Sequence, residues 1–357
     1  MIQSKTFPLW KDDGLPAMEL ADFNREAVAN FQSLLDGGQL HLVKNRCLCD
    51  NQNESKDITV SGKDRYGFAI PQILCSKCGL IRSGLVLDEE SNNKFYQYYY
   101  RNIYTAHLPI DQYFDRQTNR GAEVLKLVEE HIDISELAEV AEIGCGAGGL
   151  LLPFQDRGIE TVGFDFNEEY LQYGNSKGMH LLWGDFHTLA KEKRFDLIIL
   201  SHVFEHYTNP LQELQRILEK VKINGYIYIQ VPGIYSIPLH YKDPLTYFQN
   251  AHVYNFFEHH LRVLFESFGL KVIYGDERCT FLVQKVEDET PQVEEVFDES
   301  LTEYFEKNAN FLISCKKTWD NRDRKTIKQR LYTLACALGW RRLRTYIKPK
   351  HKYMSNE

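Results

Sequence analysis

The chain contains 357 residues, of which 43% are hydrophobic and 26% are charged, and its formal net charge is −8. These values are ordinary for a folded globular protein and exclude large-scale disorder, and the negative charge argues against a general polyanion binder. No run approaches the roughly 20 apolar residues that a membrane helix needs, and the N-terminus lacks the apolar core of a signal peptide. We therefore expect a cytoplasmic protein.

Residues 1–46 form the first predicted segment, which is helical. Apolar side chains recur at spacings of three and four residues between about positions 18 and 36. This period predicts one amphipathic helix. Gly37 and Gly38 follow it and predict its end.

Residues 47–85 form a short, strand-like segment that carries four of the eight cysteines. They are arranged as a Cys-x-Cys pair and a Cys-x-x-Cys pair, namely Cys47, Cys49, Cys75 and Cys78. Because disulfides are rare in the cytoplasm, clustered cysteines there suggest a metal. Four thiolates suit tetrahedral Zn²⁺ and leave no coordination position open. The spacing thus predicts a structural zinc module; the alternative is four thiols that hold no metal.

Residues 86–111 are strongly aromatic, with Phe95 and Tyr96 followed by Tyr98, Tyr99 and Tyr100. We interpret this segment as a connector, either simply packed between its neighbours or forming one wall of a substrate cleft.

Residues 112–285 alternate helix and strand signals. A helix is predicted at about 112–131, and strands near 140–143, 160–164, 195–200 and 226–231, with a helix before the last of these. Further on, the pattern predicts a helix at 261–268 and two late strands. Strands that alternate with helices predict an α/β fold, a Rossmann-like, doubly wound and mostly parallel sheet covered on both faces.

A glycine-rich loop follows the first of these strands, with Gly144, Gly146 and Gly149 in the spacing of a dinucleotide fingerprint. Such a loop lets the backbone approach a ligand closely. Asp165 lies 21 residues beyond Gly144, close to the spacing of an acid that binds a ribose. Both nicotinamide cofactors and S-adenosylmethionine are bound by loops of this kind, so the loop alone leaves the choice open.

Three neighbouring features favour S-adenosylmethionine. Glu142 precedes the loop, where a carboxylate suits the ammonium of an amino acid and would repel a pyrophosphate. Asp185 can accept a hydrogen bond from an adenine amino group while Phe186 packs on the ring. The segment from Ser201 to His206 follows the next strand, at the carboxyl edge where open α/β sheets bind ligands.

Residues 140–231 resemble the class I S-adenosylmethionine-dependent methyltransferases. The resemblance is carried by the segments 142–148, 163–165, 184–185, 195–206 and 224–232. It implies that Glu142, Gly144 and Gly146 surround the methionine part of the cofactor, that Asp165 holds the ribose hydroxyls and that Phe166 lies against the adenine. Asp185 and Phe186 would complete the adenine pocket.

The Cys-x-x-Cys-Gly-Leu segment, followed by aromatic residues and this domain, is similar to bacterial methyltransferases with an N-terminal zinc ribbon. These modify sugars of cell-surface glycans, nucleotide sugars and antibiotics. The sugar C-methyltransferases among them have a His-Glu-His element where this chain has Asn250-Ala251-His252. The loss of the first histidine argues against carbon methylation and for oxygen methylation.

A sugar hydroxyl must lose its proton during attack, and a histidine is the natural general base near neutral pH. His206, His252 and His202 are the candidates, because two follow the fourth strand and the third lies in a loop over the same edge. Each has an alternative as a packing or capping residue. Glu205 could assist them.

Residues 286–357 form an acidic and then basic tail that we expect to be helical and outside the sheet. Its basic amphipathic part, 326–348, could rest on an anionic membrane, which would suit a lipid-linked glycan, or bind a partner. A rival hypothesis is a zinc-ribbon nucleic-acid-binding protein, but segment 47–80 has few basic residues, so we expect no nucleic acid partner. The oligomeric state is not predicted.

Overall fold

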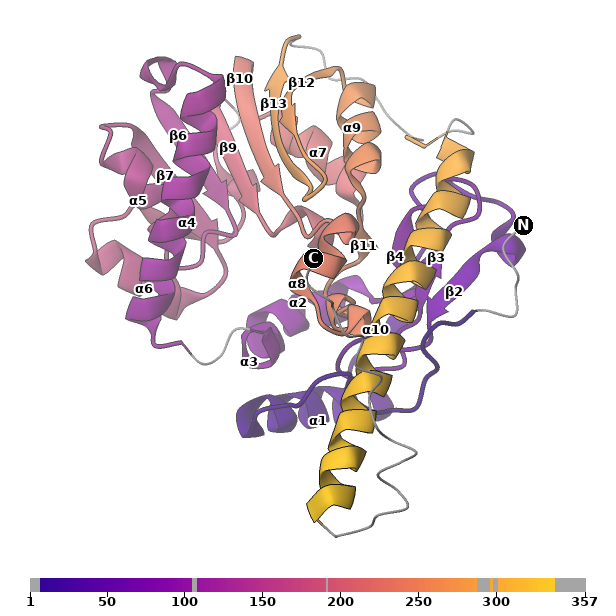
Figure 1. Ribbon diagram of the computed structural model, residues 1–357. Coiled ribbons are helices and arrows are strands. Elements are labelled where there is room, and N and C mark those ends of the chain that lie inside the picture. Colours follow the sequence, from indigo (N-terminus) through magenta and orange to yellow (C-terminus); the bar gives the residue numbers. More distant parts are fainter. Residues whose placement is uncertain (1–6, 105–107, 191, 288–295, 298–300, 338–357) are drawn as a thin grey trace, which may run out of the picture.

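A computed structural model describes residues 7–104, 108–190, 192–287, 296–297 and 301–337. Its larger part is a seven-stranded sheet with the order β12-β13-β10-β9-β6-β7-β8 (Figure 1). The five strands from β10 to β8 are parallel, whereas β13 is antiparallel to both of its neighbours. The strands are β6 (Glu139–Ile143), β7 (Glu160–Asp165), β8 (Leu181–Trp183), β9 (Phe195–Ser201), β10 (Val221–Gln230), β12 (Leu270–Gly275) and β13 (Thr280–Lys285).

Helices cover both faces of this sheet, which confirms the predicted doubly wound α/β fold. One face is covered by α4 (Ile110–His131), α5 (Leu152–Gln155) and α6 (Glu168–Ser176), and the other by α7 (Pro210–Leu218) and α9 (Glu258–Ser267) (Figure 1). The buried strands consist of apolar residues such as Leu197 to Leu200, which face both layers. On the first face α4 packs very closely, because a Cβ on Gly121 would lie 2.2 Å from the carbonyl oxygen of Leu150.

The N-terminal part forms a smaller layer that consists of one helix and short β-strands. It contains α1 (Asp22–Asp36), as predicted, a two-stranded sheet of β1 (Leu42–Lys44) and β5 (Leu85–Leu87), and the strands β2 (Ile58–Ser61), β3 (Gln72–Leu74) and β4 (Ile81–Ser83). A fourth strand, β11 (Tyr254–Asn255), joins this second sheet by pairing antiparallel with β4. The four-stranded sheet is therefore completed by residues that follow the large sheet's β10.

The aromatic segment is helical. It consists of α2 (Glu89–Lys94), a π-helical turn η3 (Phe95–Tyr99) and α3 (Tyr100–Tyr104). These lead into α4, and the rings of Phe95, Tyr100 and Tyr104 contact one another edge to face or tilted.

The last described element is α10 (Thr302–Ala337), a long helix outside the large sheet that runs past the N-terminal strands (Figure 1). Its Asn308 donates a hydrogen bond to Gly79 O at 2.9 Å, and its Tyr304 stacks on His259 with ring centroids 3.6 Å apart. The C-terminal part of the predicted basic amphipathic segment, residues 338–348, lies outside the described residues. Within the ranges that are described, no helix combines the length and the apolar character needed to span a bilayer.

Short 3₁₀ turns and one further helix, α8 (Ile237–His240), lie in the connections. The turns are η2 (Glu54–Lys56), η4 (Ile134–Glu136), η5 (Gly149–Leu151), η6 (Phe186–Thr188), η7 (Phe204–His206), η8 (Ile234–Ser236) and η9 (Pro244–Tyr247).

Candidate active site

The glycine loop turns sharply at the carboxyl end of β6. Gly144, Gly146 and Gly148 have φ values of 70°, 57° and 76°, which side chains adopt only with strain. The loop is also held by Gln117 of α4, whose Nε2 donates to Cys145 O at 2.8 Å and whose Oε1 accepts from Ala147 N at 3.2 Å. No motif marks Gln117 in the sequence, so the sequence analysis did not single it out.

Glu142 lies on β6 immediately before this loop, and its side chain is buried. Its Oε2 has no hydrogen-bond partner. Burial raises the pKa of Glu142 well above its usual value, and the charge of Asp165 adds to this shift, whereas Arg120 opposes it. A buried carboxylate oxygen without a partner is costly, so this position suits a ligand that brings a cationic donor.

Asp165 ends β7, the strand next to β6, and both of its carboxylate oxygens accept hydrogen bonds. Its Oδ2 accepts from Gly146 N at 2.8 Å, and its Oδ1 accepts from Asn167 N at 2.8 Å and from Arg101 Nη2 at 3.1 Å. Arg101 also lies over the ring of Tyr170, 3.8 Å from its centroid. The aromatic segment thus places a cation on the acid that we expect to hold a ribose. Arg101 was missed because the segment's aromatic residues dominated its interpretation.

Two exposed aromatic rings stand beside Asp165. Phe166 is 53% exposed and Trp183 is 60% exposed, and their rings meet edge to face with centroids 5.9 Å apart. Exposed rings of this size at the sheet edge suit a flat apolar ligand such as adenine. Asp185 is partly exposed nearby and caps the turn η6 through His187 N, whereas Phe186 is buried in the core. The sequence analysis did not give Trp183 a role.

The predicted histidines surround one carboxylate. Glu205 Oε1 lies 3.5 Å from His202 Nδ1, 3.8 Å from His206 Nε2 and 3.8 Å from His252 Nε2. Glu205 is buried, and neither of its carboxylate oxygens has a hydrogen-bond partner. The cluster adjoins the glycine loop, because a Cβ on Gly144 would lie 2.6 Å from Val203 Cγ2. The structure therefore brings all three histidine candidates together.

The ring nitrogens of His206 have defined surroundings. Its Nδ1 lies 2.9 Å from the carbonyl oxygen of Ala251 and 3.0 Å from the hydroxyl of Tyr96. Since a carbonyl only accepts, Nδ1 carries the proton and Nε2 keeps its lone pair toward Glu205. Burial lowers the pKa of His206, although the charge of Glu205 opposes this, and burial lowers the pKa of His252 still further. Burial thus favours the neutral form of both imidazoles, and His206 in this form offers the lone pair of its Nε2.

The N-terminal layer holds His252 in place. Ser83 of β4 donates from its backbone to Val253 O and from its hydroxyl to His252 O, both at 2.9 Å. Asp64 is fully buried and accepts from Asn250 N at 3.0 Å. Tyr104 donates to the side-chain oxygen of Asn250. The segment 250–253 is therefore fixed by residues more than 140 positions earlier in the chain.

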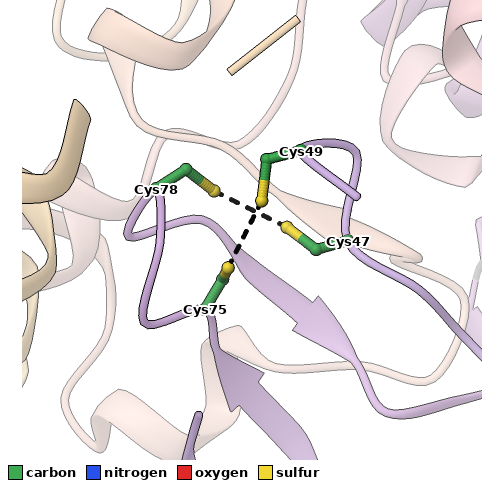
Figure 2. A group of neighbouring side chains, drawn as sticks. All are labelled: Cys47, Cys49, Cys75 and Cys78. Atoms are coloured by element: carbon green, nitrogen blue, oxygen red, sulfur yellow. Dashed lines mark hydrogen bonds between the residues drawn. The ribbon is translucent and has the colours of Figure 1, made fainter. Parts of the chain in front are cut away.

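The four predicted zinc ligands converge (Figure 2). Their sulfur atoms all lie within 4.8 Å of one another, with Cys47 Sγ 3.6 Å from Cys78 Sγ and Cys49 Sγ 3.5 Å from Cys75 Sγ. Ligands at the usual Zn–S distance and tetrahedral angle lie roughly 3.8 Å apart. All four thiols are buried. The donor set therefore fits a tetrahedral zinc ion.

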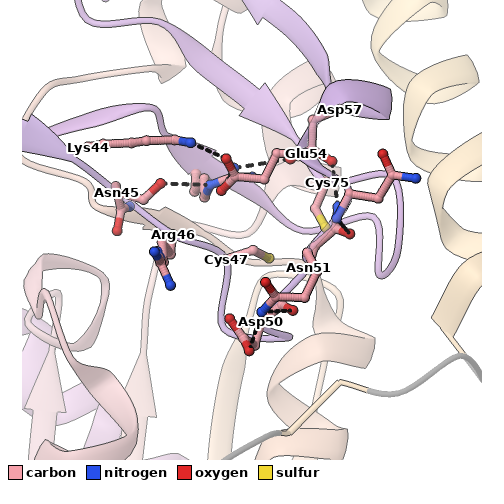
Figure 3. A network of polar contacts seen from close by, with 12 residues as sticks. Lys44, Asn45, Arg46, Cys47, Asp50, Asn51, Glu54, Asp57 and Cys75 are labelled. Atoms are coloured by element: carbon pink, nitrogen blue, oxygen red, sulfur yellow. Dashed lines mark hydrogen bonds and ion pairs between the residues drawn. The ribbon is translucent and has the colours of Figure 1, made fainter.

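A polar network supports this quartet (Figure 3). Asp57 accepts from Asn51 Nδ2 at 2.8 Å and from the backbone of Ser76 at 2.8 Å, which ties the loop after the first cysteine pair to the second pair. Arg82 of β4 donates to the other oxygen of Asp57 at 3.0 Å. Such partners fix the orientation of a ligand set before a metal binds.

Comparison with known proteins identifies the domain family. The family model described as a methyltransferase domain matches residues 94–274, half of the chain. Curated proteins named ubiquinone biosynthesis O-methyltransferase are similar: that of Rickettsia canadensis is 26% identical over 106 residues, 28% of this chain and 44% of that protein. An uncharacterized methyltransferase of Staphylococcus carnosus is 25% identical over 134 residues, 35% of this chain and 64% of that protein. The chain thus spans less than two thirds of the length of these curated relatives.

Solved structures are similar at low identity. The magnesium protoporphyrin IX methyltransferase of Synechocystis PCC 6803, solved with bound SAH, is 16% identical, with 56% of this chain and all of that chain covered and a TM-score of 0.42. A SAM-dependent methyltransferase from Archaeoglobus fulgidus is 20% identical, with 47% and 94% covered and a TM-score of 0.37. With the family match over half of its length, the chain belongs to the family described as a methyltransferase domain.

Proposed function

We propose that the enzyme methylates a hydroxyl oxygen of a sugar, carried on a nucleotide sugar, a surface polysaccharide or a lipid-linked glycan. The observation that carries the proposal is the group of three histidines around Glu205, next to the glycine loop. A hydroxyl placed in this group would meet a proton acceptor and the methyl donor together. Orientation of this kind can lower the activation barrier by many kcal/mol.

Different residues around the glycine loop would bind different parts of the cofactor. Glu142 would bind the ammonium of the methionine part, Gly144 and Gly146 would allow its close approach, and Asp165 would bind the ribose hydroxyls. When bound, S-adenosylmethionine supplies an activated methyl group on a sulfonium. Phe166 would pack against the adenine, with Asp185 completing the pocket. Phe186, which was predicted to pack on the adenine ring, is 2% exposed and lies in the core instead; the exposed ring of Trp183 beside Phe166 would take its place.

On the acceptor side, His206 offers the best placed base. Its Nδ1 proton is engaged by Ala251 O, so its Nε2 can take the hydroxyl proton. His252 and His202 are the other candidates. His202 is the most exposed of the three, with 41% of its side chain accessible, and could pass the proton to solvent.

Oxygen rather than carbon methylation is supported by Asn250. It stands where the similar sugar C-methyltransferases carry the first histidine of their element, and both its backbone N–H and its side-chain oxygen are taken up by Asp64 and Tyr104. An amide that is bound in this way offers no base for removing a carbon-bound proton. The similar Rickettsia proteins, which are named O-methyltransferases, also favour oxygen as the acceptor.

We also propose that the cysteine quartet holds one structural Zn²⁺, as in the N-terminal ribbon of the similar sugar methyltransferases. We expect no nucleic acid partner. Contact with the inner membrane face would involve the basic segment 326–348, of which residues 338–348 lie outside the described residues.

A labelled-methyl transfer screen tests the acceptor. The panel contains nucleotide sugars, lipid-linked glycans and catechol-type phenols, each with the wild-type enzyme and with His206→Ala and His252→Ala. We expect transfer to a sugar hydroxyl that both variants reduce by about 10²–10⁴-fold, the usual contribution of a general base. Exclusive transfer to phenols would refute the sugar proposal, and full turnover by both variants would place the base elsewhere.

A further inference from the structure

A second cluster of metal-ligating side chains lies at the carboxyl edge of the large sheet, apart from the cysteine quartet. Glu205 and His206 come from the turn η7 after β9, and His252 comes from the segment that leads into β11. One ligand atom from each lies within 4.8 Å of the other two. In this arrangement two imidazoles and a carboxylate face a common point.

We infer that Glu205, His206 and His252 bind a divalent transition-metal ion. Two imidazoles and one carboxylate suit Zn²⁺, Fe²⁺ or Mn²⁺, whereas Mg²⁺ and Ca²⁺ prefer ligand sets made of oxygen. Three protein ligands leave a coordination position open, as in catalytic zinc sites.

The carboxylate of Glu205 supplies an independent reason for a cation. Its side chain is 2% exposed, and neither oxygen has a hydrogen-bond partner. A buried carboxylate whose oxygens accept no hydrogen bond is strongly disfavoured. A bound divalent ion would satisfy both oxygens at once.

The spacing and the outer contacts fit such an ion. Both Nε2 atoms lie 3.8 Å from Glu205 Oε1, a few tenths of an ångström more than the roughly 3.4 Å between ligands of one tetrahedral zinc ion. His206 donates its other ring proton to the carbonyl of Ala251 at 2.9 Å, the outer contact that metal-bound histidines usually make.

Gln249 supplies a further polar group at the same place. Its amide lies against His252 Nε2, and its Oε1 is buried without a partner. Movement of this amide away from the imidazole would free the lone pair of His252 Nε2 for the ion and leave a further polar group beside the cluster.

The role of this site rests on the proposed function, although its existence does not. An acceptor hydroxyl bound at the open position would have a lowered pKa. Its O–H bond breaks, the proton passes to His202 and on to water, the oxygen forms a bond to the methyl carbon, and the S–CH₃ bond breaks to leave S-adenosylhomocysteine. His206 and His252 would then act as ligands instead of bases.

Metal content of the full chain tests the site. After removal of metal and reloading with Zn²⁺, the wild-type protein should hold two equivalents per chain, one in the cysteine quartet and one here. His206→Ala, His252→Ala and the isosteric Glu205→Gln should each hold one, while the exposed His131→Ala should keep two. Loading with Co²⁺ reports folding of the variants, because the thiolate charge-transfer bands of the quartet should persist in all of them.

Each outcome decides a separate point. A wild-type stoichiometry of one, or two equivalents in the three variants, would overturn the metal site. Full methyl transfer by protein that holds only the quartet's ion would overturn its catalytic role and leave the proposed sugar methylation intact. Two equivalents without transfer to any sugar would contradict the proposed function and leave the metal site standing.

Discussion

Substitution of Glu142 by glutamine separates a binding role from a structural one. Glu142 is buried, its Oε2 lacks a partner and burial raises its pKa, so its negative charge is unfavourable in the empty protein. Glutamine has the same shape without the charge. We therefore expect the free energy of unfolding of the empty Glu142→Gln variant to be no lower than that of the wild type. If this carboxylate had a purely structural role, its replacement would instead lower the free energy of unfolding.

Cofactor affinity should change in the opposite sense. A hydrogen bond between a carboxylate and an ammonium contributes about 1.5–3 kcal/mol, which is about 10- to 150-fold in Kd. Calorimetry with S-adenosylhomocysteine measures this loss, and 5′-methylthioadenosine, which lacks the amino acid, should bind both proteins equally. Glu139→Gln at the other end of β6 is the matched control. Unchanged affinity of Glu142→Gln for S-adenosylhomocysteine would refute the assignment.

Three further changes test other parts of the molecule. Cys75→Ser should release the zinc proposed for the quartet and lower the free energy of unfolding by more than about 4 kcal/mol. The control Cys315→Ala should have the same zinc content as the wild type in metal analysis. Gly121→Ala should cost about 1–3 kcal/mol, because its Cβ would overlap Leu150 O at 2.2 Å; urea unfolding should show no such loss for Glu123→Ala on the exposed face. His259 has its pKa lowered to about 2 by burial, and the groups facing it are His260, Tyr304 and Lys307. The unfolded chain therefore takes up a proton below about pH 6.5 that folded His259 does not, and stability should fall by roughly 1 kcal/mol per pH unit. Unfolding at pH 7.5 and 5.5 should show a shallower fall in His259→Phe, and an equal fall in both proteins would contradict this cause.

The sequence predicted those features that depend on local pattern. The strands β6, β7, β9 and β10 and their helices follow from apolar period and length, and the glycine loop with Glu142 follows from spacing. The two-residue strand β11 could not be predicted, because its pairing with β4 joins positions about 170 residues apart and two residues carry no period. For the same reason Arg101 on Asp165 was not foreseen: an ion pair across 64 positions leaves no local signal.

The directions of side chains were the other feature that the sequence did not predict. Phe186 and Trp183 are close in sequence, yet Phe186 is 2% exposed and Trp183 is 60% exposed. The turn η6 begins at Phe186, with Asp185 as its cap, and carries the ring into the core. The direction of the ring therefore depends on a turn that the sequence pattern did not indicate.

Because β11 pairs with β4, the position of His252 beside Glu205 depends on the N-terminal part that carries the cysteine quartet. The Cys75–Cys78 knuckle lies between β3 and β4, and β4 fixes the segment 250–253 through Ser83. Loss of the quartet's ion would loosen β4, because the knuckle directly precedes it and would keep only its packing and its hydrogen bonds to residues such as Asp57, His260 and Asn308. His252 would then leave Glu205, although the glycine loop on β6 would stay in place. Loss of the ion from the cysteine quartet should therefore abolish methyl transfer while S-adenosylhomocysteine still binds. A module that only stabilised the fold would not affect methyl transfer and cofactor binding differently.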